Sequence, residues 1–405
     1  MRTIDDLRQM QALPLDLKVS LTKARIRQWV NEYGEDGVYV SFSGGKDSTV
    51  LLTIARQMYP TIPAMFVNTG LEFPELVQFV KTFDNVDIIR PKKNFKQVIQ
   101  HYGYPFIAKE VAEVVYHAKN YLRKLAEKEY SEEEKVPYEY AFRKLCGIGE
   151  YSKDGDKQAV DLVALANSKD KWEMPYRISL LTGKYESFWG KKLRGEMEKD
   201  GKPSRAKYSQ VKWQFLLNAP FDVSHRCCNV MKKEPAHRYA KQTGRHPMTA
   251  QMADESRLRT QQWLLHGCNG FDLKTPISNP MSFWTEQDVL QYIKENNIKI
   301  APVYGEVIKT EVETDLPKGQ LRINLDGTIE EPPCVYETTG CKRTGCVFCG
   351  FGCHLEKDGE HRFVKLKQTH PKLYEYLMKP ESEGGLGYKE KIDWLNENGN
   401  LHIKY

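Results

Sequence analysis

The chain has 405 residues and a formal net charge of +6, and 40% of its residues are hydrophobic and 28% are charged. These values are typical of a globular protein with a main domain and appended modules, and they exclude a polycation of the histone kind. The sequence has no apolar run of about 18 residues and no signal-like N-terminus. We therefore expect a cytoplasmic protein with no membrane partner.

Strands and helices alternate through the first hundred residues. Val38, Val40 and Phe42 alternate with smaller or polar residues, which is typical of a strand in a half-buried sheet. The residue pattern predicts helices over 14–34, 74–83 and 94–103, and strands over 38–42, 63–70 and 86–91. Such alternation indicates βαβ units, and it predicts an α/β fold with a parallel sheet covered by helices on both faces.

The stretch SGGKDS, residues 43–48, joins the first predicted strand to an apolar helix. Backbone N–H groups and the positive end of the helix dipole converge where a glycine turn enters a helix, so this stretch predicts an anion site. The glycines allow close approach of the anion, the lysine adds positive charge, and the serines add donors. The spacing is not that of a Walker-type loop. A glycine turn with a solvated lysine is the alternative.

SGGKDS resembles the pyrophosphate-binding loop (PP-loop) of the adenine-nucleotide α-hydrolase superfamily, which includes ATP pyrophosphatases and sulfonucleotide reductases. These enzymes bind an adenine nucleotide and act at its α-phosphorus. The resemblance implies that the loop holds the pyrophosphate of a nucleotide, with Mg²⁺ when the nucleotide is ATP. The residues concerned are Ser43, Gly44, Gly45, Lys46, Asp47 and Ser48. Asp47 would either orient the metal or cap the helix.

Asn68, Thr69 and Gly70 end the second predicted strand. Ligands of parallel sheets bind beyond the carboxyl ends of the strands, so we expect these three residues to face the same ligand as residues 43–48. The stretch VNTGLEFPEL also resembles the second-strand motif of the superfamily, which faces the nucleotide. A strand that ends in an ordinary turn is the alternative.

The strand–helix rhythm is lost over residues 108–215, which predicts an insertion that is helical in its first half. Basic and aromatic residues interleave in its second half, as suits binding of DNA or RNA. Acidic residues dilute this patch and favour an ordinary solvated surface. The basic residues are Lys191, Lys192, Arg194, Lys202, Arg205 and Lys207, the aromatic ones Tyr185, Trp189, Tyr208 and Trp213, and the acidic ones Glu186, Glu196, Glu198 and Asp200.

The α/β pattern resumes with a predicted strand from Met248 to Met252 and a helix that carries ESRLR. This block resembles the part of the 3′-phosphoadenylyl sulfate (PAPS) reductase family that places arginines near the nucleotide's phosphate or sulfate. Guanidinium groups suit such oxyanions. The resemblance implies that Arg257 and Arg259 bind the nucleotide, and that Arg257 acts in catalysis together with Lys46 and Asp47.

FWTEQDVLQYIKENNI, residues 283–298, resembles another block of the same family. Thr285 and Asp288 are predicted to cap a helix whose apolar residues face the core. We expect this segment to have a structural role.

Nine cysteines argue against a disulfide framework in a chain of this kind and favour metal ligation or catalysis. Cys341, Cys346, Cys349 and Cys353 have C-x4-C-x2-C-x3-C spacing, which predicts an iron–sulfur or a four-cysteine zinc site. In adenylyl-sulfate reductases a CC pair and a later CxxC hold a [4Fe–4S] cluster. That resemblance implies the ligand set Cys227, Cys228, Cys346 and Cys349, and the compact run is the rival set. Cys146, Cys268 and Cys334 are isolated, and each is expected to be buried.

The reaction is the least determined prediction. Sulfonucleotide reductases attack sulfur with a cysteine on a C-terminal tail, and no cysteine follows Cys353. DNA phosphorothioation and tRNA thiolation proteins use a similar loop to activate a substrate with ATP, releasing pyrophosphate. The resemblance therefore implies ATP-dependent activation and iron–sulfur-assisted sulfur transfer, with nucleic acid, a sulfur donor or a partner protein as partners. Reduction of PAPS or adenylyl sulfate, with Cys341 or Cys353 as nucleophile, is an alternative. A non-catalytic subunit that binds nucleotide and nucleic acid is another.

The predicted domain organisation has four parts. Residues 1–107 and 216–300 would form the nucleotide-binding domain, interrupted by the insertion over 108–215. Residues 301–405 would form a cysteine-rich metal module and a tail.

Overall fold

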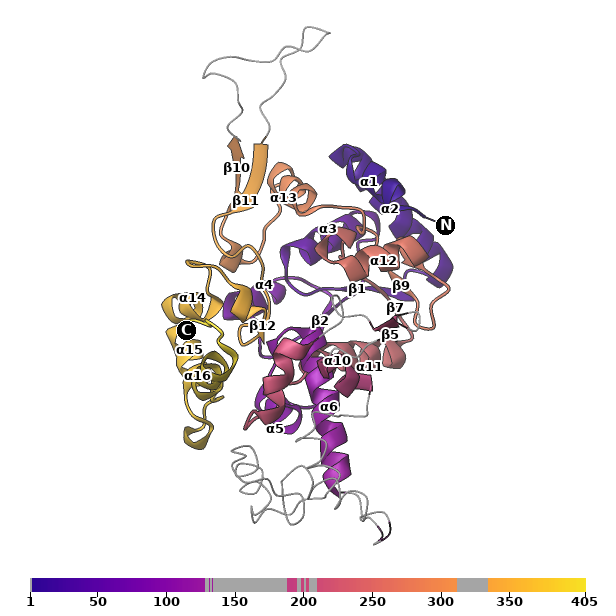
Figure 1. Cartoon of the computed structure of the whole chain (residues 1–405). Helices are drawn as coiled ribbons and strands as arrows, with labels where there is room; N and C mark the ends of the chain where they lie inside the picture. The colour runs from indigo at the N-terminus through magenta and orange to yellow at the C-terminus, as the bar shows by residue number, and fades with distance from the viewer. Residues whose placement is uncertain are drawn as a thin grey trace, which may run out of the picture. The chain divides into compact units, whose positions relative to one another are not determined.

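The computed structural model describes residues 2–127, 131, 133, 188–194, 198–199, 202–203, 210–311 and 334–405 (Figure 1). The chain forms two compact units, each made of two stretches of sequence. The first unit comprises Met1–Phe95 and Val230–Val347, and the second comprises Lys96–Asn229 and Phe348–Tyr405. The four-part organisation expected from the sequence stays a prediction.

The first unit is built on a six-stranded sheet with the order β3-β2-β1-β7-β9-β8 (Figure 1). Neighbouring strands are parallel, except that β8 and β9 are antiparallel. The strands are β1 (Val38–Ser41), β2 (Ala64–Val67), β3 (Val86–Ile89), β7 (His246–Met248), β8 (Asn269–Gly270) and β9 (Ile277–Ser278). The predicted α/β fold with a mainly parallel sheet is confirmed.

Side chains of β1 alternate between two cores, which explains why helices cover both faces of the sheet. Val38 and Val40 point into the larger core. Tyr39 points the other way and packs edge-on against Tyr239 of α11 (Glu234–Thr243), with ring centroids 5.0 Å apart. A strand with both faces buried is typical of parallel sheets.

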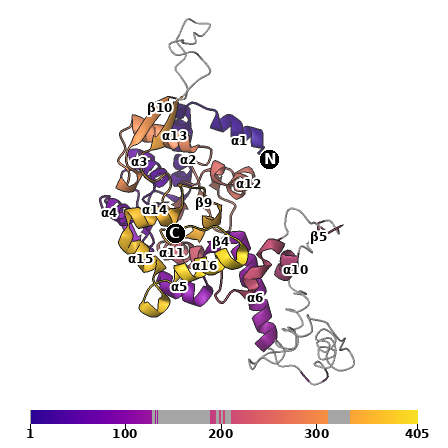
Figure 2. The ribbon, with the colours of Figure 1, turned by 60° about the vertical axis from the view of Figure 1, so that its left-hand side comes forward.

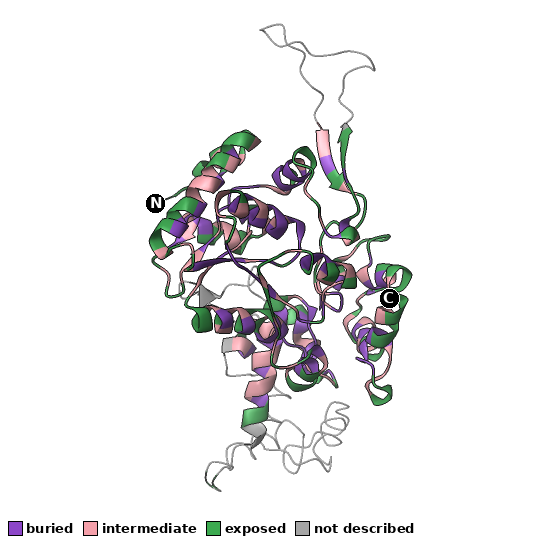
Figure 3. Ribbon diagram, turned by 180° about the vertical axis from the view of Figure 1, so that it is seen from behind, coloured by how far each residue is buried: buried purple, intermediate pink, exposed green. Residues whose placement is uncertain are grey.

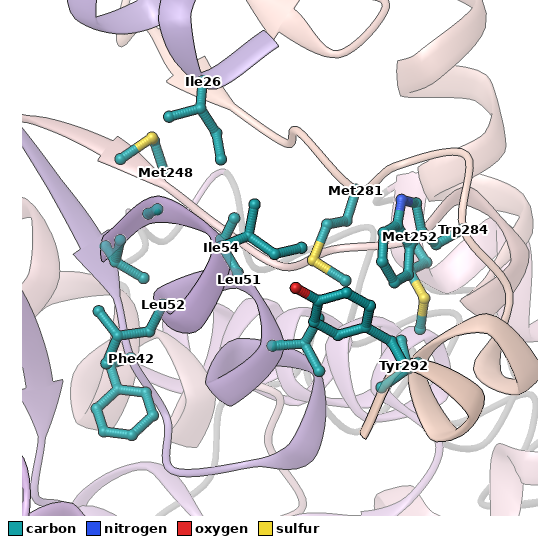
Figure 4. Packing of buried hydrophobic residues seen from close by; sticks show 14 of the residues in the cluster. Ile26, Phe42, Leu51, Leu52, Ile54, Met248, Met252, Met281, Trp284 and Tyr292 are labelled. Carbon is teal, nitrogen blue, oxygen red and sulfur yellow. The ribbon is translucent and has the colours of Figure 1, made fainter. Parts of the chain in front are cut away.

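The larger core lies between the sheet and the remaining helices of this unit. Leu51, Leu52 and Ile54 of α3 (Lys46–Met58) belong to this core, as do Phe42 and Trp284 (Figure 4). Burying one such side chain stabilises the fold by about 1.5–3 kcal/mol. The helices are α1 (Ile4–Gln11), α2 (Leu15–Tyr33), α3 (Lys46–Met58), α4 (Pro74–Val80), α12 (Arg257–His266) and α13 (Glu286–Glu295).

Burial differs strongly between these helices (Figure 3). The first helix buries only Leu7, whereas most of α3 is inside the protein. The predicted capping of α13 is confirmed, because Thr285 and Asp288 form a reciprocal capping box. Asp288 also accepts two hydrogen bonds of 2.7 Å from the buried Lys18 ammonium of α2. This ion pair fixes α2 against the start of α13.

One predicted element differs from the structure. The strand expected from Met248 to Met252 runs from His246 to Met248. It ends there because a 3₁₀ turn, η4 (Ala253–Glu255), begins shortly afterwards, with Met252 as its N-cap residue. The helix that carries ESRLR follows at once as α12.

Four further elements complete the first unit. The turn η5 (Pro302–Tyr304) leads into β10 (Val307–Glu311), which pairs antiparallel with β11 (Cys334–Thr338). The short helix η3 (Asn229–Lys233) has π geometry and precedes α11. Of the three isolated cysteines, Cys268 is buried as expected, Cys334 is half-buried, and Cys146 lies outside the described residues.

The second unit is mostly helical. Its short strands β4 (Phe106–Ile107) and β12 (Gly350–Phe351) pair in parallel. Helix α15 (Pro371–Met378) packs against both α14 (Arg362–Thr369) and α16 (Tyr388–Gly399) (Figure 2). Its other elements are α5 (Phe95–Tyr102), α6 (Lys109–Glu127), α10 (Phe188–Arg194), β5 (Glu198–Lys199), β6 (Lys202–Pro203), η2 (Val211–Asn218), η6 (Cys353–Leu355) and η7 (Glu381–Glu383).

The insertion predicted over 108–215 begins with a helix, α6, as expected. Most of its remaining residues, including Arg205, Lys207 and Tyr208, lie outside the described residues. Within the ranges that the structure describes, no helix is long and apolar enough to cross a membrane.

Candidate functional site

The SGGKDS stretch forms the tight turn between β1 and α3. Gly44 has a φ of +73°, a conformation that glycine adopts readily and other residues avoid. A Cβ at Gly44 would also lie 2.7 Å from side-chain atoms of Leu76 and Val80. Both the backbone angle and the close approach of α4 therefore require glycine here.

Two serines brace this turn from inside. The hydroxyls of Ser43 and Ser48 lie 3.0 Å apart. Ser48 also accepts a hydrogen bond of 3.2 Å from the Ser43 N–H group, and the Gly45 N–H group donates to the Ser43 hydroxyl at 3.3 Å. The loop is thus held at the N-terminus of α3, where the helix dipole attracts anions.

Lys46, the first residue of α3, has a buried side chain with 3% of the residue exposed. Its ammonium lies 2.9 Å from a carboxylate oxygen of Glu286 and donates to the carbonyl oxygen of Lys342 at 3.1 Å. The ring of Tyr304 lies beside it, with its centroid 5.8 Å from Nζ. The positive charge is therefore fixed at the loop by groups from three distant segments of the chain.

Asp47 adds a carboxylate to the same place. Its Oδ1 atom lies 3.9 Å from the Lys46 ammonium, is buried, and has no hydrogen-bond partner among the described residues. Burial raises the pKa of Asp47, the positive charges of Lys46 and Arg343 lower it, and the nearby Glu286 raises it further. The carboxylates of Asp47 and Glu286 lie beside the turn, and one oxygen of Asp47 is unsatisfied among the described residues. This arrangement suits a bound divalent cation such as Mg²⁺.

The two arginines of ESRLR have different environments. Burial lowers the pKa of the Arg259 guanidinium, Arg343 lowers it further and Asp47 raises it, so these three groups lie close enough to interact. Arg259 also forms an ion pair with Glu255. Arg257 is exposed at the first turn of α12. Of the two arginines, the structure brings Arg259 to the loop.

The residues expected at the end of β2 form a rigid turn. Thr69 is buried and donates its hydroxyl to the Glu72 carboxylate at 2.8 Å, while its N–H group donates to the same carboxylate at 3.0 Å. Asn68 Oδ1 accepts from the Gly70 N–H group at 3.1 Å. The polar groups of this turn are thus largely engaged with one another.

The segment between the first two cysteines of the run, Cys341 and Cys346, packs on the same loop. The Thr344 hydroxyl lies 2.5 Å from the Tyr304 hydroxyl, which in turn accepts a long hydrogen bond of 3.4 Å from the Lys46 N–H group. The Cys341 N–H group donates to the Val303 carbonyl oxygen at 2.9 Å. The chain between Cys341 and Thr344 is therefore part of the site.

A cavity of about 160 Å³ opens at the carboxyl ends of β1 and β2. Ser43, Glu72, Lys232, Thr344 and Gly345 are among the residues that line it. Ligand pockets for whole small molecules usually enclose about 300–1,000 Å³. The cavity therefore matches a phosphate or pyrophosphate group better than a complete nucleotide.

Three cysteines of the second unit, Cys227, Cys349 and Cys353, lie near Tyr388, whose side chain is fully buried. Burial raises the pKa of Tyr388, and Cys349, Cys227 and Cys353 raise it further because they lie near its hydroxyl. Burial also raises the pKa of Cys349, with an additional contribution from Cys228. Burial therefore disfavours the thiolate of Cys349 unless a positive charge is added.

The segment that carries Cys349 and Cys353 is held by several contacts. The Arg362 guanidinium donates to the Cys349 carbonyl oxygen at 2.9 Å. The Gly352 N–H group donates to the Ile107 carbonyl oxygen at 2.6 Å. Ile107 itself has a φ of +68°, which is rare for a β-branched residue. Strain of this kind persists only where the surrounding packing fixes it, and it is frequent at functional sites.

The candidate cysteine ligands are divided between the two units. Cys227, Cys228, Cys349 and Cys353 belong to the second unit, whereas Cys341 and Cys346 belong to the first. Neither of the two ligand sets considered from the sequence therefore lies within one unit. The cysteine-rich segment is chemically suited to a metal ion or a metal cluster.

The sequence match identifies the family. A family model described as the phosphoadenosine phosphosulfate reductase domain matches residues 37–135 and 191–350. The chain belongs to this family. An uncharacterized protein of Methanocaldococcus jannaschii is 36% identical over 72 residues, which is 17% of this chain and 18% of that protein. The chain thus matches less than a fifth of that relative's length.

Phosphoadenosine phosphosulfate reductase domains bind adenine nucleotides, so the loop at the start of α3 lies in a nucleotide-binding domain.

The sequence analysis missed several residues around this loop. Glu286 lies in the FWTEQDV block, to which only a structural role was assigned, and its contact with Lys46 adds an electrostatic one. Lys232, Tyr304 and Arg343 had no local motif to mark them, whereas Glu72 lies in the VNTGLEFPEL stretch, two positions after Gly70, and was given no role.

Replacement of Lys46 by alanine is expected to weaken binding of Mg²⁺–ATP by about 10- to 100-fold, because a charge-assisted contact in a dry site is lost. Lys46→Arg is expected to give little recovery, since the buried position fits a compact ammonium and not a planar guanidinium. Titration with nucleotide, followed by tryptophan fluorescence, measures both variants.

Lys81→Ala is the matched control, because Lys81 is an exposed lysine of the same unit at the end of α4. It should bind nucleotide like the wild type. Wild-type affinity in a folded Lys46→Ala variant would show that the loop does not hold the phosphates.

Proposed function

We propose that this protein uses Mg²⁺–ATP to activate an acceptor and then supports transfer of sulfur to it. The observation that carries this proposal is the arrangement of Asp47 and Glu286 around the Lys46 ammonium, with one buried oxygen of Asp47 unsatisfied within the described residues. Two carboxylates repel the phosphates of a nucleotide unless a cation lies between them. Mg²⁺ is typically bound by one or two carboxylates together with substrate phosphates.

The proposed chemistry has two balanced steps. An acceptor oxygen attacks the α-phosphorus of ATP, the bond to the bridging oxygen breaks, and pyrophosphate leaves. A hydrosulfide ion released from the donor then attacks the activated carbon or phosphorus, AMP leaves with the acceptor oxygen, and loss of the sulfur-bound proton leaves sulfur in place of that oxygen. DNA or RNA is the acceptor class that we propose, and the sulfur donor is a partner protein or a small molecule that releases sulfide.

The protein's own groups would mainly bind and orient the phosphates. Lys46, the turn at Gly44 and Gly45, and the dipole of α3 would neutralise and hold the pyrophosphate as it leaves. Arg259 would bind the oxygens of the α-phosphate. We propose that Arg257, which points another way from the first turn of that helix, contacts another part of the nucleotide or an oxyanion of the acceptor. Ser43, Ser48 and the residues Asn68, Thr69 and Gly70 would complete the surroundings of the nucleotide.

We propose a [4Fe–4S] cluster at the cysteines. Cys227, Cys228 and Cys349 would supply three ligands, and Cys346, three residues before Cys349, would supply the fourth. Burial raises the pKa of Cys349, and metal ligation would stabilise its thiolate, which supports a bound cation of this kind. When bound, such a cluster supplies soft iron centres for handling sulfur. A four-cysteine zinc site is the structural alternative.

Reduction of a sulfonucleotide is the second candidate, and the proximity of Arg259 and Arg343 favours it. Such a pair of guanidinium groups suits a sulfate or phosphate ester. In this reaction a cysteine thiolate attacks the sulfate sulfur and the adenosine phosphate leaves. An external dithiol then reduces the S-sulfocysteine and releases sulfite. Cys341 is the candidate nucleophile, because it begins the segment that packs on the loop.

The test compares the products of two nucleotides with protein purified without oxygen. We expect AMP and pyrophosphate from Mg²⁺–ATP in the presence of nucleic acid, and no sulfite from PAPS with a dithiol. Asp47→Asn should lower the ATP reaction by about 100-fold, because a ligand of the metal is lost. Asp36→Asn, an exposed aspartate of the same unit, should react like the wild type. Chromatography of the nucleotides measures all of these.

Sulfite release from PAPS would contradict the proposal and select the second candidate. Binding of both nucleotides without turnover of either would indicate a non-catalytic subunit.

Iron and acid-labile sulfide should be present in the anaerobic protein, and Cys227→Ser and Cys349→Ser should each lose most of the iron. Cys346→Ser is expected to lose iron as well, whereas Cys353→Ser is expected to keep it. Cys334→Ser, at a half-buried cysteine of β11, is the control. Iron analysis and visible absorption distinguish these outcomes. Loss of iron in Cys353→Ser but not in Cys346→Ser would reverse the choice of the fourth ligand, and zinc in place of iron would contradict the cluster.

A further inference from the structure

A second group of metal-binding side chains lies in the second unit and contains no cysteine. The ligand atoms of Glu113, His117 and His225 all lie within 4.8 Å of one another. In the part of the chain that the structure describes, no other three histidine, cysteine, aspartate or glutamate residues are grouped this closely. All three residues are half-buried, so their side chains are partly shielded from solvent but still accessible to an ion or a small molecule.

Helix geometry brings the first two residues together. Glu113 and His117 are separated by four positions on α6, so their side chains lie on one face, one turn apart. Figures 1 and 2 both show α10 beside α6. The ring of Trp189 on α10 stacks on the His117 imidazole, with centroids 4.7 Å apart and planes 16° apart. Stacking restricts the orientation of this imidazole.

His225 comes from a different segment, which is fixed independently. The Tyr104 N–H group donates to the Asp222 carbonyl oxygen at 2.7 Å, and the Ser224 N–H group donates back to the Tyr104 carbonyl oxygen at 2.9 Å. A Cβ on Gly103 would lie 2.5 Å from the backbone of Asp222, so glycine is required for this approach. The residue immediately before His225 is therefore tied to the backbone next to β4.

Two cations of α6 hold the same segment against the helix. The Lys119 ammonium donates to the carbonyl oxygens of Ala219 at 2.8 Å and Phe221 at 3.0 Å. The Arg123 guanidinium donates to the Asp222 carboxylate at 2.6 Å. These contacts do not involve the three grouped residues. The segment is therefore held against α6 by contacts that include no bond between the candidate metal ligands.

The imidazole of His225 also has an unsatisfied atom. Its Nδ1 is buried and has no hydrogen-bond partner among the described residues. The ring centroids of His225 and His117 are 5.6 Å apart. A buried polar atom without a partner is unfavourable by about 1–3 kcal/mol, and a bound ion is one of the arrangements that removes this penalty.

We propose that Glu113, His117 and His225 bind one divalent transition-metal ion and leave a coordination position open for water or a substrate oxygen. Two imidazoles and one carboxylate form a ligand set used for catalytic Zn²⁺ and for non-haem Fe²⁺. Three protein ligands leave a tetrahedral or octahedral ion incompletely coordinated. This site is independent of the proposed nucleotide chemistry and of the cysteine ligands.

Co²⁺ is the first probe, added to the full-length protein after anaerobic purification and treatment with EDTA. One equivalent should bind and give the visible bands of Co²⁺ with nitrogen and oxygen ligands, without the strong near-ultraviolet absorption of thiolate ligation. His117→Ala and His225→Ala should each weaken binding by at least about 30-fold, and Glu113→Gln by about 10- to 100-fold. Glu110→Gln, on the same helix but paired with Lys192, should bind like the wild type.

Thiolate absorption at the first equivalent would place the metal on cysteines and overturn the proposal. Unchanged binding in His117→Ala would also overturn it.

A measurement on the wild type covers the case in which a histidine variant fails to fold. Zn²⁺ should protect His117 and His225 from modification by diethyl pyrocarbonate, read by mass spectrometry, and should leave the half-buried His354 unprotected. Equal modification of His117 and His225 with and without Zn²⁺ would contradict the site. Metal analysis after equilibration with Fe²⁺ and Zn²⁺ in competition identifies which ion the site prefers.

Discussion

The ion pair of the buried Lys46 ammonium is the interaction on which the rest of the proposed nucleotide site depends. Removing a charge from water is unfavourable by several kcal/mol unless it is paired and hydrogen-bonded. Lys46 meets this requirement through Glu286 at 2.9 Å and the Lys342 carbonyl oxygen at 3.1 Å. These partners come from α13 and from the segment between Cys341 and Cys346. A single charge thus ties two distant parts of the chain to the start of α3.

The parallel sheet explains why these parts meet at this place. The carboxyl ends of β1 and β2 lie side by side, so the loops that follow them open on a common edge. The helix dipole of α3 and the small cavity lie at that edge. The segment of Cys341 to Thr344 packs there as well. The proposed nucleotide-binding loop and the chain that leads to the proposed cysteine ligands therefore meet at one edge of the sheet.

Local features of the fold could be predicted from the sequence, whereas distant contacts could not. The capping box of Thr285 and Asp288 depends on residues three positions apart, and the turn at Gly44 depends on its neighbours. Tyr304 reaches Lys46 across 258 positions, and no local pattern marks such a contact. The helical spacing of the two arginines could, however, have predicted that only one of them faces the loop. Arg257 and Arg259 are two positions apart on a helix and cannot point the same way.

Hydrogen–deuterium exchange with and without Mg²⁺–ATP tests most directly whether the loop and the segment between Cys341 and Cys346 form one nucleotide site. If they do, nucleotide will slow exchange in peptides covering 42–49 and in peptides covering 339–346, and it will leave α1 unchanged. Slowed exchange in the first set alone would contradict the shared site. No change in either set would contradict nucleotide binding at this loop.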